Sequence, residues 1–264
     1  MKAHIAPVTA QNPHDLFESF AETLESVRDT DALVRAGFAY ATLGGVQQFI
    51  SHVDAIGNWE GIRKEFMIGI HHAITEPSAL ENLRRITHSQ VRVYVPGRRL
   101  GATALVAKPV FHPKVLAIST EDGGNLRMVQ TGSTNMTSSA IGCRPQNYEF
   151  SLAILAESDA SLDQNSRFDT WWLSLWAESR RVDRRFIRNY AELRKRVLDQ
   201  NPILRSEVEA PPGIGDVESF FCEVGAGSGP PGSRHQIEFP EALARFFGQV
   251  ERRRRGITLK RGED

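Results

Sequence analysis

Short apolar runs alternate, through the first half of the chain, with segments whose apolar residues recur every three or four positions. In order, these segments are 12–27, 37–42, 45–55, 65–70, 77–86 and 91–95, with helical and strand patterns taking turns. In the first, Phe17, Phe20 and Leu24 form one stripe, as on a buried helix face. This alternation predicts an α/β fold in which a mixed, largely parallel sheet is sandwiched between helices.

The middle of the chain predicts three more strands and a short helix. The strands are expected at 111–118, 126–131 and 150–156. Pro113 lacks an N–H, so the first of them should be irregular or unpaired at that residue. Two adjacent glycines within residues 121–125 favour a tight turn into the second strand. A helix over 134–140 would present free N–H groups suited to a phosphate.

Aromatic residues recur at helical spacing further on, and the amino-acid composition of the chain then changes. The aromatic and apolar stripe consists of Phe168, Trp171, Trp172, Leu175 and Trp176 on a helix that begins near Asp163. Such a stripe is typical of a core or a dimer interface. Beyond Leu204, glycine and proline become frequent. We therefore predict one domain over residues 1–205 and a C-terminal extension over 206–264.

Composition limits the classes of protein that fit. The chain has 264 residues and zero net charge, which argues against a nonspecific nucleic-acid coat. Its two cysteines, Cys143 and Cys222, are too few for a disulfide framework or a zinc knuckle. His71 and His72 have no further ligands at suitable spacing, so no metal site is expected. Without a signal-peptide core or an apolar run of about 18 residues, we expect a cytoplasmic protein that does not insert into a membrane.

The charge is unevenly distributed. Between residues 84 and 120 there is no acidic residue, while the basic residues are Arg84, Arg85, Arg92, Arg98, Arg99, Lys108 and Lys114. This local excess suits a polyanionic substrate, with Arg98, Arg99 and Lys108 as candidate contacts. A second cluster comprises Arg180, Arg181, Arg184, Arg185 and Arg188. Two interpretations stay open for it: a track for a phosphate backbone, or a solvated helix face paired with Glu178, Asp183 and Glu192.

Three short blocks carry candidate chemistry: His112 and Lys114, then the run from Gly132 to Asn135, then Glu149. In a strand, residues i and i+2 point to one face, so an imidazole and an ammonium would project together. A neutral imidazole can attack phosphorus, and a protonated one can give a proton to the leaving oxygen. Lysine and asparagine donate hydrogen bonds to phosphoryl oxygens. A carboxylate such as Glu149 can fix the imidazole tautomer.

These blocks, in this order, resemble the motif of the phospholipase D superfamily: HxK, then an acid, then GSxN, then a carboxylate. The matching residues are His112, Lys114, Gly132, Ser133, Asn135 and Glu149. The common acid falls at Ser119, which is a departure that weakens a lipid-cleaving interpretation. The combination of Phe-His-Pro-Lys with Gly-Ser-x-Asn-Met-Thr is more similar to the restriction-endonuclease branch. In that branch the acid is often missing, and the later glutamate takes its role.

The resemblance implies a metal-independent, cofactor-free phosphodiesterase that cuts nucleic acid, with DNA favoured over RNA, in restriction or antiviral defence. It implies a phosphohistidine on His112 and a homodimer that shares one composite site, because the mechanism needs two imidazoles. Ser133 and Thr134 would contact the phosphate or shape the turn, with Gly132 at the strand end. Residues 220–240 also resemble the opening of a DNA-recognition domain, here reduced or truncated. Two alternatives stay open: a noncatalytic nucleic-acid-binding or assembly subunit of a defence complex, and a phospholipid hydrolase or transferase.

Overall fold

The computed structural model describes most of residues 2–205 and none beyond. The described residues are 2–8, 15–27, 32–54, 56–57, 59–95, 100–105, 109–120, 125–141, 149–156, 165–202 and 205. The chain divides into two units, 1–212 and 213–264, and the second lies wholly outside the described residues. The domain boundary at residue 205 therefore stays a prediction, as do the interpretations of the C-terminal extension and of both cysteines.

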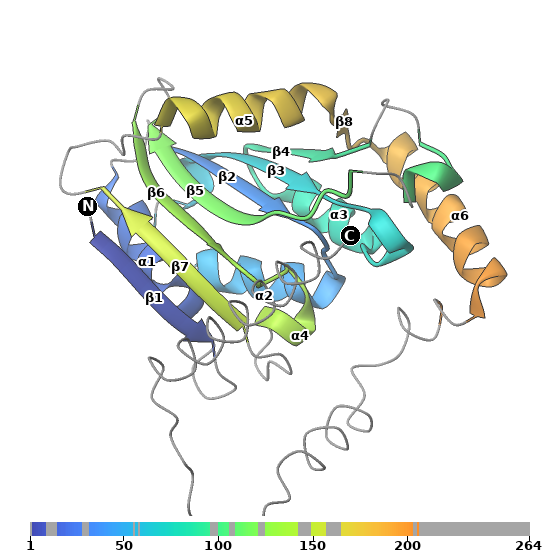
Figure 1. Cartoon of the computed structure of the whole chain (residues 1–264), viewed down its shortest axis with the longest axis horizontal. Coiled ribbons are helices and arrows are strands. Elements are labelled where there is room, and N and C mark those ends of the chain that lie inside the picture. Colours follow the sequence, from blue (N-terminus) through green and yellow to red (C-terminus); the bar gives the residue numbers. More distant parts are fainter. Residues whose placement is uncertain are drawn as a thin grey trace, which may run out of the picture. The chain divides into compact units, whose positions relative to one another are not determined.

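Eight strands of the described chain form one mixed sheet (Figure 1), in the order β1-β7-β6-β5-β2-β3-β4-β8. The strands are β1 (Lys2–Val8), β2 (Ala32–Phe38), β3 (Arg63–Ile68), β4 (Ser89–Val93), β5 (Lys114–Thr120), β6 (Leu126–Gly132), β7 (Glu149–Leu155) and β8 (Arg180–Arg181). Only β2–β3 and β3–β4 pair in parallel; the other neighbours are antiparallel. The α/β prediction is confirmed, but "largely parallel" was wrong, because the later strands return through short connections rather than helical crossovers.

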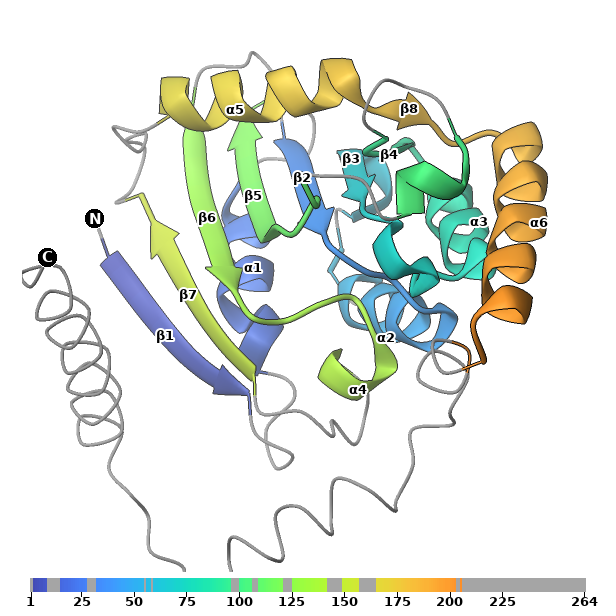
Figure 2. The same ribbon diagram turned by 45° about the vertical axis from the view of Figure 1, so that its right-hand side comes forward.

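Helices cover both faces of this sheet, as predicted. The described helices are α1 (Asp15–Ser26), α2 (Leu43–Val53), α3 (Pro77–Arg85), α4 (Ser138–Ile141), α5 (Asn165–Glu178) and α6 (Arg184–Gln200), with 3-10 turns at Trp59–Gly61, His71–Ala73 and Ala102–Leu105. In Figures 1 and 2, α5 crosses one side of the sheet, and α1, α2 and α3 lie on the other. The stripe Phe17, Phe20 and Leu24 is buried, as its spacing predicted.

The core has a large part on one face of the sheet and, on the other, a small part with a minor cluster of Ala117 and Leu126 beside it. The large part joins α1, α2, α3 and α6 to alternate residues of the central strands, such as Val34, Phe66 and Ile118. The small part packs Trp172 of α5 against residues that include Met67 and Val115. The predicted role of the aromatic stripe in the core is thus confirmed for Trp172, while Trp171 and Leu173 are exposed.

An ion-pair cluster inside the protein explains why one strand was misplaced. The sequence pattern predicted a strand over 37–42, whereas β2 spans Ala32–Phe38 and is buried along its whole length. Arg35 lies in the middle of that strand and hides its apolar pattern. Its Nε donates to Glu65 Oε2 (3.2 Å), and its Nη1 donates to Asp169 Oδ1. Trp172 Nε1 donates to the same Glu65 oxygen (2.9 Å), which ties α5 to β3.

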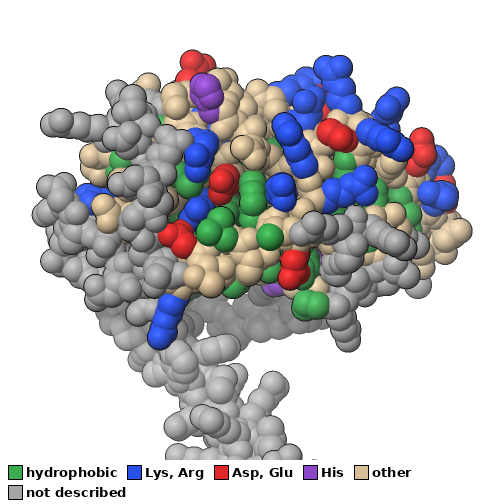
Figure 3. Space-filling view, turned by 90° about the horizontal axis from the view of Figure 1, so that it is seen from above, with side chains coloured by type: hydrophobic (Ala, Val, Ile, Leu, Met, Phe, Trp, Pro, Cys, Tyr) green, Lys and Arg blue, Asp and Glu red, His purple; other side chains and the backbone are tan. Residues whose placement is uncertain are grey.

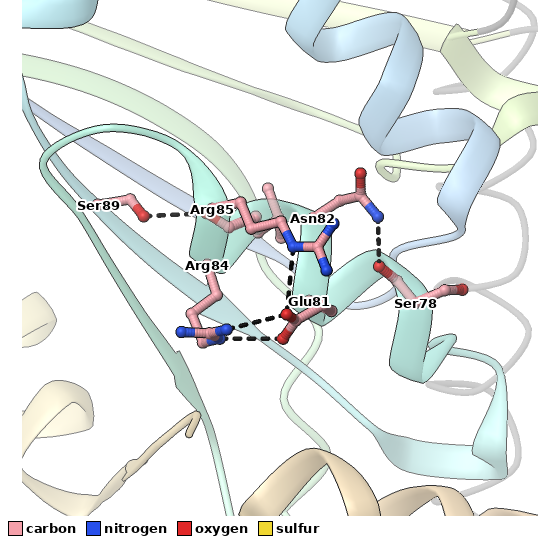
Figure 4. A network of polar contacts seen from close by, with 7 residues as sticks. Ser78, Glu81, Asn82, Arg84, Arg85 and Ser89 are labelled. Carbon is pink, nitrogen blue, oxygen red and sulfur yellow. Dashed lines mark hydrogen bonds and ion pairs between the residues drawn. The ribbon is translucent and has the colours of Figure 1, made fainter. Parts of the chain in front are cut away.

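The arginines that precede His112 in the sequence do not form a free cationic flank within the described residues. On α3, the Glu81 carboxylate binds both Arg84 and Arg85, at 2.9 and 3.2 Å (Figure 4). Arg92 lies under α5, where its Nη1 donates to Trp176 O (2.6 Å) and Ser179 O (3.1 Å). These three side chains therefore serve the fold. Arg98, Arg99 and Lys108 fall outside the described residues.

Candidate active site

The three chemical blocks meet at one end of the sheet, although up to 37 positions separate them along the chain. There, β2 and β6 end while β5 and β7 begin, at Phe38, Gly132, Lys114 and Glu149 respectively. The antiparallel order β7-β6-β5-β2 places these ends side by side. Figure 2 shows the connection from β6 to α4 passing along this edge. Ligand sites of α/β proteins are commonly found at strand ends of this kind.

His112 and Lys114 lie against each other, as predicted, but not within one strand. Pairing of β5 starts at Lys114, opposite Phe38, so Phe111, His112 and Pro113 precede the strand. This agrees with the irregularity expected at Pro113. Lys114 Nζ lies 2.8 Å from His112 Nδ1 and 3.1 Å from Nε2. An ammonium has only donors, so at least one ring nitrogen must offer a lone pair, as a neutral imidazole does.

The pKa shifts of this pair favour the neutral imidazole. Burial lowers the pKa of His112, and the positive charge of Lys114 lowers it further. Burial also lowers the pKa of Lys114, while the nearby Glu149 carboxylate acts in the opposite direction. His112 nevertheless remains exposed to solvent. An exposed, unprotonated imidazole beside a cation can act as a nucleophile toward a bound anion.

Tyr40 is a neighbour of His112 that the sequence did not suggest. The two rings make an edge-on contact with centroids 6.0 Å apart. Tyr40 follows β2, and the chain at 40–42 runs beside the Gly-Ser-x-Asn block: Met136 N–H donates to Tyr40 O (3.2 Å), and Thr42 N–H donates to Met136 O (2.9 Å). No local pattern marks Tyr40, because it lies 72 positions before His112 and reaches it only through the β2–β5 pairing.

Gly132 is required by a close backbone approach between β6 and β7. A Cβ placed on Gly132 would lie 1.9 Å from Phe150 O and 2.9 Å from Ser151 Cα. Glycine therefore lets β7 begin directly beside the end of β6. Ser133 N–H donates to Phe150 O and Phe150 N–H donates to Ser133 Oγ, each at 3.0 Å.

Glu149 contacts Ser133, which is not the partner that the sequence suggested. The Ser133 hydroxyl donates to Glu149 Oε2. The expected role of Glu149 in fixing the imidazole tautomer stays a prediction. What the structure gives is a carboxylate that orients Ser133 and lies close enough to Lys114 to influence its pKa.

Thr134 and Asn135 lie outside any helix, so the helix expected over 134–140 is found only from Ser138 onward. Helix α4 spans only Ser138–Ile141, and Met136, two residues before it, forms a bridge with Ala41 instead. Asn135 is thus not at a helix start. Among the described residues, Thr134 Oγ1 and Asn135 Oδ1 are buried without a hydrogen-bond partner. Unpartnered buried groups beside a site are candidates for contact with a ligand.

Ser119, which stands where the superfamily motif has its acid, is far from the imidazole. It is five residues beyond Lys114 on β5, which corresponds to about 17 Å along a strand. Ser119 is buried, and it pairs with Leu33 on β2. The position that holds serine instead of the acid therefore lies inside the sheet, away from the reacting groups.

The described part of the chain offers neither a metal site nor a membrane-spanning helix. No group of three or more His, Cys, Asp or Glu side chains among those residues is placed to hold a metal ion. No helix in the same residues is long and apolar enough to span a bilayer.

Several solved structures align with this chain at low sequence identity. NucT from Helicobacter pylori aligns at 16% identity and TM-score 0.46, covering 69% of this chain and 99% of that one. Phosphatidylserine synthase from Haemophilus influenzae (15%, 0.43) covers 77% of this chain and 46% of that one, and polyphosphate kinase from Porphyromonas gingivalis (12%, 0.43) covers 65% and 26%. No family model and no curated protein matches the chain. At such identities and TM-scores, the case for a reaction rests on the site alone.

Proposed function

We propose that this protein is a metal-independent phosphodiesterase that cleaves nucleic acid, DNA in preference, through a covalent phosphohistidine. One observation carries the proposal: the exposed His112 ring lies 2.8 Å from Lys114 Nζ, at the sheet edge that also holds Ser133, Asn135 and Glu149. A neutral nucleophile and a cation that can hold a phosphoryl oxygen are what displacement at phosphorus needs.

The first step forms a bond between a ring nitrogen of His112 and phosphorus, and breaks the bond from phosphorus to the leaving oxygen. That oxygen takes a proton from a second, protonated imidazole. In the second step, the now neutral second imidazole accepts a proton from water. The resulting hydroxide attacks phosphorus, the N–P bond breaks, and both histidines return to their starting states.

The remaining groups bind the phosphate. Lys114 and Asn135 donate to the non-bridging oxygens, whose charge is redistributed in the transition state. Ser133 is held by Glu149 and by the start of β7, so its position is fixed before the substrate arrives. Positive charge from Lys114 takes the part that a metal ion has in other phosphodiesterases.

The second imidazole is supplied by another copy of the chain. One chain contains one such block, and a twofold axis through the site would bring two copies of His112 together. Two exposed apolar side chains, Val110 (37% exposed) and Phe150 (38%), flank His112 and Glu149 in the sequence. Their burial in such an interface would remove apolar surface from water.

The proposed role in restriction or antiviral defence rests on the sequence resemblance. The plating efficiency of phage on cells with and without the protein tests this role.

Cleavage of labelled DNA in excess chelator tests the chemistry. We expect cutting without divalent ions, and loss of cutting in His112→Asn. The matched control is His88→Asn, because His88 is an exposed histidine before β4 with a backbone φ of 54° that asparagine tolerates. An acid-labile phosphate adduct should form on the wild-type protein. A strict need for a divalent ion, or full activity in His112→Asn, contradicts the proposal.

Subunit mixing tests the composite site separately. If each centre needs two copies of His112, adding an equal amount of His112→Asn subunits with full exchange should halve the wild-type activity, since about a quarter of the dimers then carry both imidazoles. Independent subunits would leave the activity unchanged. Turnover of a phospholipid but not of DNA would favour the lipid alternative, and DNA binding without any adduct would favour a noncatalytic subunit.

A further inference from the structure

Four arginines form an exposed basic surface on β8 and the first turns of α6. The arginine surface consists of Arg181, Arg184, Arg185 and Arg188, all exposed. Figure 3 shows Lys and Arg side chains gathered over β8 and the start of α6 on this face. The proposed mechanism uses none of them.

The acidic residues nearby do not neutralise this surface. Asp183 caps α6 by accepting from Phe186 N–H (2.6 Å), and Glu178 accepts from the Tyr94 hydroxyl (3.3 Å). Among the described residues, no ion pair involves a member of the arginine surface. The contrast is with Arg84 and Arg85, which share Glu81 (Figure 4). The ion pairs that the second interpretation expected for this cluster are therefore not found among the described residues.

The position of these cations is unfavourable for the helix itself. Arg184 and Arg185 are the first two residues of α6, and the first turn contains no acidic residue. A helix N-terminus carries partial positive charge, which repels cations placed there. The helix dipole therefore does not favour these side chains, whereas an anion bound beside them would meet their guanidinium groups.

The sheet register fixes how far this surface lies from the candidate active site. Lys114 pairs with Phe38, Phe38 with Ile68, Ile68 with Val93, and Val93 with Arg180. Four strand spacings of about 4.8 Å give about 19 Å between Lys114 and Arg180. At a rise of 3.4 Å per base pair, this corresponds to about five or six base pairs of duplex DNA.

We propose that the arginine surface binds the sugar–phosphate backbone of duplex DNA, about five or six base pairs from the phosphate that is cleaved. The inference rests on the proposed function, which places the scissile phosphate at His112. A membrane fits less well, because the apolar side of α6, with Phe186, Tyr190 and Leu193, is buried in the core and cannot insert into lipid.

Binding is tested in the His112→Asn background, where DNA stays intact. The variant Arg184→Gln with Arg188→Gln removes two charges one helical turn apart and keeps a good helix former. Its charge-matched control on the same helix is Lys195→Gln with Arg196→Gln. Fluorescence anisotropy of a labelled duplex of about 24 base pairs, long enough to pass the surface, gives Kd as a function of salt.

We expect the slope of log K against log salt to fall by about 1.8 in the test variant, with Kd about 50-fold weaker at 0.1 M salt. The control should keep the wild-type slope. The melting temperature of the test variant should be equal or higher, because cations leave a helix N-terminus. Equal slopes in the test and control variants overturn the inference.

A second readout separates this inference from the proposed function. With His112 present, the test variant should hydrolyse the small diester bis(p-nitrophenyl) phosphate at the wild-type rate, because that substrate does not reach the arginine surface. If His112-dependent hydrolysis is found while the DNA slopes are equal, only the inference fails. If the slope changes but no diester is ever cleaved, only the proposed function fails.

Discussion

Replacing Gly132 by alanine tests whether the close approach of β6 and β7 holds the candidate site together. The added Cβ would lie 1.9 Å from Phe150 O, a backbone atom that cannot rotate away. Carbon and oxygen need more than 3 Å, so the start of β7 must move by about 1 Å or more. That movement carries Glu149 and breaks the paired contacts between Ser133 and Phe150.

Two magnitudes follow from this displacement. Overpacking of this kind destabilises a protein by about 1–3 kcal/mol. Misplacing a catalytic constellation by about 1 Å lowers the rate about 100-fold. Gly57→Ala is the matched control, because a Cβ at Gly57 meets nothing within 4 Å. Chemical denaturation and the initial rate of diester hydrolysis measure the two effects. If Gly132→Ala behaves like Gly57→Ala in both assays, the described packing of the two strands is wrong.

Three further outcomes are expected. Arg35→Met should destabilise the fold by about 3–5 kcal/mol in urea denaturation, because Glu65 and Asp169 would keep their charges without the buried partner; a loss under 1 kcal/mol contradicts this. Burial lowers the pKa of Lys64 from 10.5 to about 8. Between these two pH values the unfolded chain binds more protons than the folded one, so this group should make the free energy of unfolding rise with pH. Lys64→Met should remove that part of the slope, and identical pH profiles would refute it. Ser119→Ala should leave turnover unchanged, because its buried hydroxyl has no partner among the described residues and lies about 17 Å along β5 from Lys114; a tenfold loss would place Ser119 in the machinery.

Much of the fold could be predicted from local pattern. The helices at 45–55 and 77–86 were found as α2 and α3, displaced by at most two residues at either end. The strands at 126–131 and 150–156 were found as β6 and β7 within one residue. These elements have clear apolar periodicity and flanking turn residues, which are properties of a few neighbouring positions.

The misplaced elements show where local pattern fails. β2 was displaced because Arg35 breaks its apolar run, and only Glu65 and Asp169, 30 and 134 positions away, make that arginine acceptable inside the protein. β1 was missed, since it is an edge strand defined by its pairing with β7. The helix expected at 134–140 gave way to a bridge between Ala41 and Met136.

The sequence by itself determined the reacting groups: His112 two positions before Lys114, a Gly-Ser-x-Asn block and a later glutamate, because the chemistry of these residue types and their short spacings does not depend on the rest of the chain. Only the tertiary structure decided their partners. In the folded chain, Tyr40 contacts His112, and Ser133 donates a hydrogen bond to Glu149. Arg84 and Arg85 form ion pairs with Glu81, whereas the arginine surface has no ion pair among the described residues. The physical reason is that strand register and helix packing set contacts between residues far apart in sequence, and no local periodicity encodes those distances.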